Sequence, residues 1–228
     1  MPIHNDLVLR TIQQISQILA HLLNQRDQAT FERLTQELDQ IYRNQLGVPR
    51  SLMHDLDGES LIEILSSTGR LDHERAFLLS EMLRAEALGL DARDRPVPPE
   101  LRIKALNLVL AAAADGSDVE ELPDRIVEHQ QALDGVDLPE PTVWRLFDHR
   151  FRIGGFAGAE DLLFEALDRF GVGPEALERG RAFYGDLRDR TDAALRRGGL
   201  PRDEIEEGEA TMEERGAAAG AGRGTTEP

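Results

Sequence analysis

The sequence predicts an all-α protein built from antiparallel helical hairpins. Apolar residues recur at intervals of three and four along most of the chain, which is the spacing of one buried helix face. No stretch shows sustained two-residue alternation, so no strand is expected. Aromatic residues make up only 5% of the chain, and the rest of the apolar content is mostly Leu, Ala, Ile and Val, a mixture that with many Glu and Arg favours helices over sheets.

The first 48 residues are predicted to form a helical hairpin. A polar segment at 24–30 separates two amphipathic runs, and Gly47 and Pro49 end the second one. We expect the two helices to pack within the chain, with packing against a second copy as the alternative. The apolar stripes comprise Ile12, Ile15, Leu19 and Leu22 in the first helix and Phe31, Leu34, Leu38 and Ile41 in the second.

The middle of the chain continues with helices. Short helical turns are expected in 51–67, and a longer helix over 73–90. The proline-rich segment 91–100 ends that helix, because proline cannot continue one. The next helix, 100–115, is apolar on nearly every side and is therefore expected to be central and buried. A further helix is expected within 119–135.

Two small residues mark a close helix contact near residue 160. An amphipathic helix at 141–153 is followed by the glycine turn at 154–155 and a returning helix at 156–170. Ala159 and Ala166 lie two turns apart on one face of the returning helix, where they would let its backbone approach the partner helix closely.

These residues resemble the tetratricopeptide-repeat family. The pattern is a glycine at the turn, an aromatic residue two positions later and small residues at two fixed positions beyond it; a weaker copy of part of this spacing occurs in 102–113. The matching residues are Gly154, Phe156, Ala159 and Ala166, with Ala105, Val109 and Ala112 in the weaker copy. The chain as a whole also resembles an uncharacterised bacterial family of helical proteins. The likeness implies a right-handed superhelix of helical pairs over 72–200, within one helical domain spanning 1–200.

The carboxyl end changes in composition. Residues 174–199 are predicted to be helical, beginning with Pro174 in a first turn. Residues 201–228 are acidic and end in a low-complexity run of Ala and Gly. Such a composition buries little apolar surface, so this tail is expected to be mostly disordered, with at most a short acidic helix.

Composition also narrows the function classes. A net charge of −17 with interleaved arginines argues against a nucleic-acid partner, which requires clustered basic residues. No apolar run approaches the roughly 20 residues of a membrane span, and the chain has no cysteine. We therefore expect a cytoplasmic protein without a membrane contact.

The sequence contains no recognisable catalytic or metal-binding motif. Its histidines lack the spacing that would place two ligands on one helix face, and no nucleophile elbow or phosphate-binding loop is present. No cofactor and no metal are expected, and an enzyme whose cavity the sequence does not reveal is the weakest of three hypotheses.

The leading hypothesis is a protein-interaction or scaffold module that binds a protein or peptide partner. The alternative is a structural protein that oligomerises through its N-terminal hairpin. By resemblance, the first helix of the repeat would line a peptide groove, although the aromatic residues of that helix could instead belong to the core. The candidate partner-binding residues are Trp144, Arg145, Asp148, His149, Phe151 and Arg152.

Overall fold

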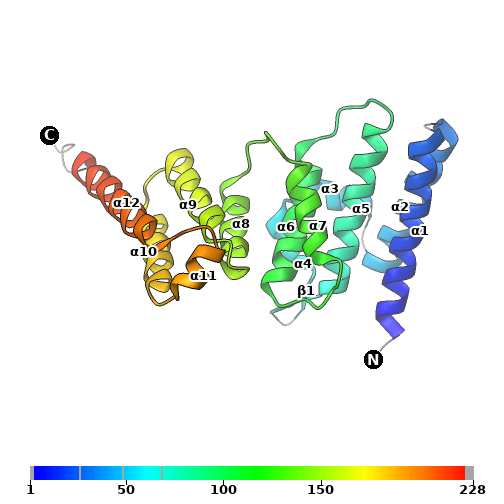
Figure 1. Cartoon of the computed structure of the whole chain (residues 1–228). Coiled ribbons are helices and arrows are strands. Elements are labelled where there is room, and N and C mark those ends of the chain that lie inside the picture. The colour runs from blue at the N-terminus through cyan, green and yellow to red at the C-terminus, as the bar shows by residue number, and fades with distance from the viewer. Residues whose placement is uncertain (1–2, 26, 48, 68, 224–228) are drawn as a thin grey trace. The chain divides into compact units, whose positions relative to one another are not determined.

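A computed structural model describes residues 3–25, 27–47, 49–67 and 69–223 (Figure 1). Within these residues the protein is almost wholly helical, as the sequence predicts, and its helices pack in pairs. The chain divides into two compact units, Met1–Asp137 and Leu138–Pro228. The division falls in the loop before residue 140, whereas the sequence analysis expects one helical domain over 1–200.

The first unit contains seven α-helices, a π-helical turn and a minimal hairpin within its described residues. In chain order they are α1 (Ile3–Gln25), α2 (Gln28–Ile41), η1 (Tyr42–Leu46), α3 (Arg50–Asp55), α4 (Gly58–Ile64), β1 (Ser66–Ser67), β2 (Arg70–Leu71), α5 (His73–Asp91), α6 (Pro99–Ala114) and α7 (Leu122–Gln131).

The predicted N-terminal hairpin is present and packs within the chain. Helices α1 and α2 pack against each other and against α5. Gln14 donates a hydrogen bond to Glu37 across the pair, with 2.8 Å between Nε2 and Oε2. At Gly89 of α5, an added Cβ would lie 3.0 Å from a methyl carbon of Leu34, so the glycine allows α2 to approach closely. The apolar face of the hairpin is thus covered by α5.

Helix α5 is the central element of this unit. It is buried on nearly every side, and α1, α2 and α6 all pack against it. The predicted burial of 100–115 is also confirmed, since α6 is buried along most of its length. Two acidic residues, Glu81 and Glu86, are enclosed with the apolar residues of α5.

The expectation that the chain has no strand needs one small correction. Strands β1 and β2 are two residues each and pair antiparallel, with Ser66 opposite Leu71. Gly69 lies in the connecting turn with φ +79°, a conformation that L side chains rarely adopt. So short a hairpin produces no periodic sequence signal.

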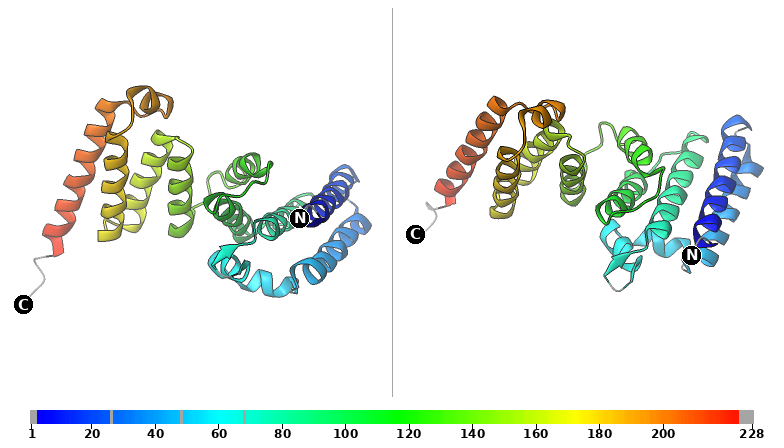
Figure 2. Two further views of the ribbon diagram at one scale, coloured as in Figure 1. Left: turned by 90° about the horizontal axis from the view of Figure 1, so that it is seen from below. Right: turned by 60° about the horizontal axis from the view of Figure 1, so that its bottom comes forward.

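The second unit comprises five helices within residues 138–223, the part of it that the structure describes. They are α8 (Glu140–Arg152), α9 (Phe156–Phe170), α10 (Pro174–Arg188), α11 (Asp192–Arg197) and α12 (Arg202–Arg223). Helix α8 pairs with α9, and α10 pairs with α12 (Figure 2). The core of the unit is formed mainly by aromatic and leucine side chains between these pairs.

The predicted alanine positions are buried as expected. Ala159, Leu163 and Ala166 of α9 are at most 1% exposed, and α9 packs along α8. Gly154 makes the turn between the two helices with φ +80°. Phe156, at the start of α9, has its ring centroid 6.0 Å from that of Phe151 on α8, so it bridges the two helices.

The prediction of a mostly disordered tail over 201–228 is wrong for the residues that the structure describes. Residues 202–223 form α12, and 224–228 lie outside the described residues. Ile205 and Met212 are buried in the core of the unit. Composition alone missed this helix because few apolar residues hold it to α10, and the remaining contacts are close approaches at glycines and ion pairs such as that of Arg181 with Glu213.

Candidate functional site

The predicted binding face on α8 is partly exposed and is completed by a residue from α10. Trp144 is half-buried, and its ring meets Phe147 edge-on with centroids 5.6 Å apart. The guanidinium of Arg179 on α10 lies 5.0 Å from the centroid of the indole, a cation–π geometry. Asp148 lies 3.7 Å from the same guanidinium. Trp144, Arg179 and Asp148 thus form one cluster, of which the sequence analysis missed Arg179.

Phe151 belongs mainly to the core. Its ring stacks on Phe147 at 6.5 Å and meets Phe183 edge-on at 5.4 Å. These rings form a rigid aromatic base beneath the half-buried Trp144. Phe151 therefore supports the surface and is not one of its most accessible residues.

The remaining candidates lie on adjoining parts of α8. Arg152 is exposed at the end of the helix, and Arg145 is half-buried. Within the described residues, the buried Nδ1 of His149 makes no hydrogen bond. Burial lowers the pKa of His149, and the nearby charges of Arg152 and Arg150 add to this effect.

Helix α8 and Arg179 make a locally basic surface in a strongly acidic chain. Three arginines of α8 and Arg179 stand against three acids, Glu140 and Asp148 on α8 and Glu175 on α10, which lies 3.5 Å from Arg179, whereas the chain as a whole carries −17. Burial raises the pKa of Asp148, while the charge of Arg179 opposes that shift. The surface therefore suits a partner that carries negative charge.

A second cluster, in the first unit, surrounds the buried carboxylate of Glu86. The side chain of Glu86 is 1% exposed and accepts three hydrogen bonds. Tyr42 donates its hydroxyl to Oε1 at 2.8 Å. On the other oxygen, Oε2, Arg50 Nη2 lies at 2.9 Å and His54 Nε2 at 2.8 Å. Helices α3 and α5 and the turn η1 thus converge on one carboxylate.

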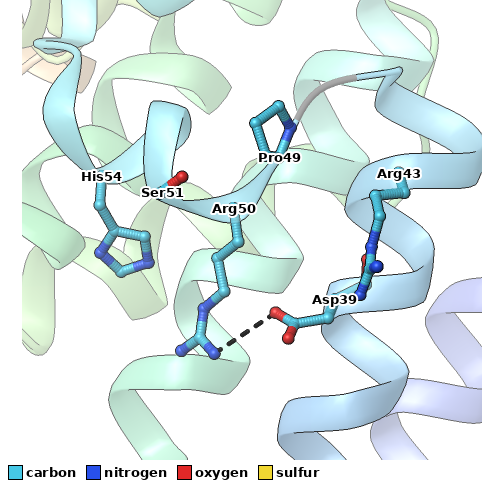
Figure 3. A pocket seen from close by; sticks show the side chains of 6 residues that line it. All are labelled: Asp39, Arg43, Pro49, Arg50, Ser51 and His54. Carbon is cyan, nitrogen blue, oxygen red and sulfur yellow. Dashed lines mark hydrogen bonds and ion pairs between the residues drawn. The ribbon is translucent and has the colours of Figure 1, made fainter.

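Part of this cluster opens into a pocket of about 510 Å³ (Figure 3). The guanidinium of Arg50 points toward Asp39, with 3.6 Å between Nη1 and Oδ1. Arg43 lies beside Asp39 and donates Nε to the backbone carbonyl of that residue. The lining residues are Asp39, Arg43, Pro49, Arg50, Ser51 and His54.

The electrostatics of the Glu86 cluster favour a structural role for these residues over a role in proton transfer. Burial alone would raise the pKa of Glu86, but the hydrogen bond from His54 and the charge of Arg50 outweigh it, so the pKa lies below its ordinary value. Burial and the nearby carboxylate raise the pKa of Tyr42 well above its ordinary value. Glu86 is thus an ionised acceptor and Tyr42 a neutral donor, a pair without a proton to exchange near neutral pH.

A third polar cluster joins α5 to α7. Ser80 Oγ lies 3.0 Å from the carbonyl of Ala105 and 3.0 Å from Nε2 of His129. Ser80 and His129 are 0% and 2% exposed, so this serine is no accessible nucleophile. The sequence offered one signal for the Glu86 cluster: Glu86 lies between the apolar residues Ala85 and Ala87, and a buried acid requires cationic partners.

Among the described residues, no group of three or more His, Cys, Asp or Glu side chains is arranged to hold a metal ion.

A model for the family described as "Family of unknown function (DUF6483)" matches residues 2–215. The chain belongs to this family. No curated protein and no solved structure matches the chain.

Membership of DUF6483 agrees with the predicted resemblance to an uncharacterised helical family, and it shows no likeness to tetratricopeptide repeats. The match spans both units of this DUF6483 protein and reaches well into α12, so this helix is included in the family's common region. In the described part of the chain, no helix is both long enough and apolar enough to cross a membrane.

Proposed function

We propose that this DUF6483 protein is a non-catalytic interaction module that binds an acidic peptide or protein segment on the surface formed by α8 and α10. The observation that carries the proposal is the stack of Arg179 on Trp144, 5.0 Å apart, above the aromatic base formed by Phe147 and Phe151. Tryptophan and arginine are the residue types that most often dominate binding energy at protein interfaces.

Rigidity supports this choice of surface. Trp144 donates its indole N–H to Glu140 at 3.2 Å, and its ring is fixed between Phe147 and the guanidinium of Arg179. A side chain held in place before binding loses less conformational entropy when the partner arrives. Arg152, exposed at the end of α8, extends the basic surface and would steer an acidic segment toward it.

The arrangement of helices also supports the finer proposal of a tetratricopeptide-like superhelix in the second unit. Helices α8 and α10 begin at Glu140 and Pro174, which are 34 residues apart, the repeat length of that family. Each is paired with a later helix, α9 and α12 respectively. In such repeats the first helices line the binding groove, which is the role proposed for α8 and α10.

The packing of the N-terminal hairpin favours a binding module over hairpin-driven self-assembly. Leu34 and Leu38 of α2 are buried in the same core as Leu79 and Leu83 of α5. The apolar face that a second copy would need is therefore already occupied within the chain.

The test is selection of a random displayed peptide library on the immobilised full-length protein. We expect enrichment of acidic peptides that also carry an apolar anchor. Arg179→Glu and Trp144→Ala should each weaken a selected peptide by at least about tenfold in Kd, as expected for central interface residues.

The matched control is Arg169→Glu. Arg169 also stacks on an aromatic ring of the second unit, that of Phe170, at 4.8 Å, but it lies on α9. Binding should survive this change. Unaltered binding by a folded Arg179→Glu variant, or selection without acidic enrichment, would refute the proposed surface; circular dichroism establishes that each variant is folded.

A further inference from the structure

The pocket beside the Glu86 cluster has the size of a small-molecule site. Its volume of about 510 Å³ lies within the roughly 300–1,000 Å³ range of such sites. It lies where the end of α2, the turn η1 and helix α3 come together (Figure 3). The π-helical turn η1 contributes Arg43, and turns of this kind occur frequently at functional sites.

The charges at this pocket are balanced. The guanidinium groups of Arg43 and Arg50 stand against the carboxylates of Asp39 and Glu86. With a neutral imidazole at His54, neither sign is in excess. The pocket therefore calls for neither an anion nor a cation, but it offers charges of both signs close together.

Glu86 fixes one side of the Arg50 guanidinium. Nη2 of Arg50 donates to Oε2 of Glu86 at 2.9 Å, and this carboxylate is also bound by Tyr42 and His54. The other terminal nitrogen of Arg50, Nη1, is directed toward Asp39 (Figure 3). Arg50 thus presents Nη1 to the pocket from a position that a buried carboxylate holds.

The groups around Nη1 of Arg50 have hydrogen-bonding capacity that the chain does not use. Nη1 lies 3.6 Å from Oδ1 of Asp39, which is an ion-pair distance and too long for a hydrogen bond. Within the described residues, the carboxylate of Asp39 accepts no hydrogen bond, and Arg43 donates only through Nε, to the backbone carbonyl of Asp39. Donors and an acceptor therefore lie side by side and are available to a ligand.

We infer that this pocket binds a free α-amino acid with an apolar side chain. The carboxylate of the ligand binds Arg43 and Nη1 of Arg50, and its ammonium group binds Asp39. An α-amino acid carries both charged groups on one carbon atom, and this short separation suits the short distance between Nη1 and Oδ1. The side chain of the ligand packs against Pro49 and the aliphatic stems of the two arginines.

The same charges select against ligands with a single charge. A simple carboxylate would bring a second negative charge next to Asp39 without a cation to offset it. A simple amine would bring a positive charge next to Arg43 and Arg50. The site lies in the first unit and does not depend on the proposed peptide surface of α8 and α10.

The experiment is calorimetry on the full-length protein with leucine and three analogues as probes. Leucinamide lacks the carboxylate, isocaproate lacks the ammonium group, and γ-aminobutyrate carries both charges but holds them apart. Leucine should bind, and each analogue should bind at least about tenfold more weakly in Kd, because each loses or misplaces one charge-assisted contact.

Two variants and a matched control assign the contacts. Asp39→Asn should weaken leucine by about tenfold but should not weaken isocaproate, which has no ammonium group to lose. Arg43→Gln should weaken leucine by about tenfold. Arg33→Gln changes an exposed arginine of α2 outside the pocket and should leave leucine binding unaltered. Circular dichroism establishes that each variant is folded.

Three outcomes would overturn the inference. The first is absence of leucine binding at millimolar concentration. The second is binding of isocaproate, leucinamide or γ-aminobutyrate as tight as that of leucine. The third is unaltered leucine binding by a folded Asp39→Asn variant.

Discussion

Replacing Met212 with alanine should destabilise the second unit substantially. Met212 is 0% exposed, and its sulfur fits over Gly180 of α10, where an added Cβ would lie only 2.2 Å from Sδ. The side chain therefore anchors the middle of α12 in a notch that a glycine creates. Loss of this contact tests directly whether α12 is an ordered part of the core.

Met212→Ala should lower the free energy of unfolding by about 3 kcal/mol. This value lies in the lower half of the roughly 2–5 kcal/mol range for Met→Ala in protein cores, because α12 can shift somewhat to close the space. With a urea slope of about 1.5 kcal/mol per M, the unfolding midpoint should fall by about 2 M. The control is Glu214→Ala, which changes an exposed residue close to Met212 on the same helix. It should move the midpoint by less than about 0.3 M.

Tryptophan fluorescence is the appropriate assay. Trp144 is the only tryptophan in the chain, and it packs against the core of the second unit, so its emission reports the unfolding of that unit. Circular dichroism of the same samples records the loss of helix in the whole chain.

A double-mutant cycle identifies the contact itself. Gly180→Ala alone should cost about 1–3 kcal/mol through overpacking against Met212. In the Met212→Ala background the same change should cost nothing or stabilise by about 1 kcal/mol, because alanine has the higher helix propensity. Additive effects of the two changes, or a midpoint for Met212→Ala equal to that of wild type, would refute the packing of α12 described above.

Three further outcomes are expected. Glu86→Gln should cost the first unit about 3 kcal/mol in urea unfolding, because Arg50 then loses its buried counter-ion; a cost below about 0.5 kcal/mol would contradict the role given to this carboxylate. The pKa of His129 is about 3 in the folded protein, far below its ordinary value, so between about pH 6.5 and pH 3 the unfolded chain binds more protons at this residue than the folded chain does. The contribution of His129 to stability is therefore fully present above about pH 6.5 and falls progressively toward pH 3. This group should lower the free energy of unfolding by about 2 kcal/mol between pH 7 and pH 5, a difference that His129→Gln should remove. Ala159→Leu should cost about 1–3 kcal/mol by thermal or urea unfolding, whereas Asp161→Leu on the exposed side of α9 should cost little; equal effects would show that the close contact lies elsewhere.

The helices themselves could be predicted from the sequence because their signals are local. The run 156–170 became α9 with the predicted bounds, and 73–90 became α5 with one further residue. In both helices, a cap or turn residue precedes a run in which apolar residues recur with the helical period. Both the cap and the period depend only on residues a few positions apart in the chain. The glycine turn at Gly154 follows from the same local reasoning.

The candidate site could be predicted only in part. The helical period correctly placed Trp144 and Asp148 near each other on α8, but it could not supply Arg179, which comes from α10. Nor could the helical period distinguish Trp144, which is half-buried, from Phe151, whose ring packs against Phe147 and Phe183 in the core. Periodicity gives the face of one helix, and the partner helix decides which side chains on that face are covered.

The buried charged clusters were beyond sequence reasoning for a related reason. Glu86 and its partners Tyr42, Arg50 and His54 come from three separate segments, and none of these residues carries a recognisable motif. An acid inside an apolar helix signals that cationic partners must exist, because an unpaired buried charge is too costly. Which cations they are depends on how the helices pack.

The sequence by itself determined that this protein is helical, where most helices begin and end, and which faces are apolar, since these properties follow from backbone propensity and side-chain period. The tertiary structure alone decided the division after Asp137, the two buried carboxylates of α5 and the order of α12. Helix α12 shows why: its sequence is acidic and carries few apolar residues, yet Met212 fits the space above Gly180, and Arg181 pairs with Glu213 at 2.7 Å. Such complementarity exists only between surfaces that folding brings together, so no local pattern in the chain can record it.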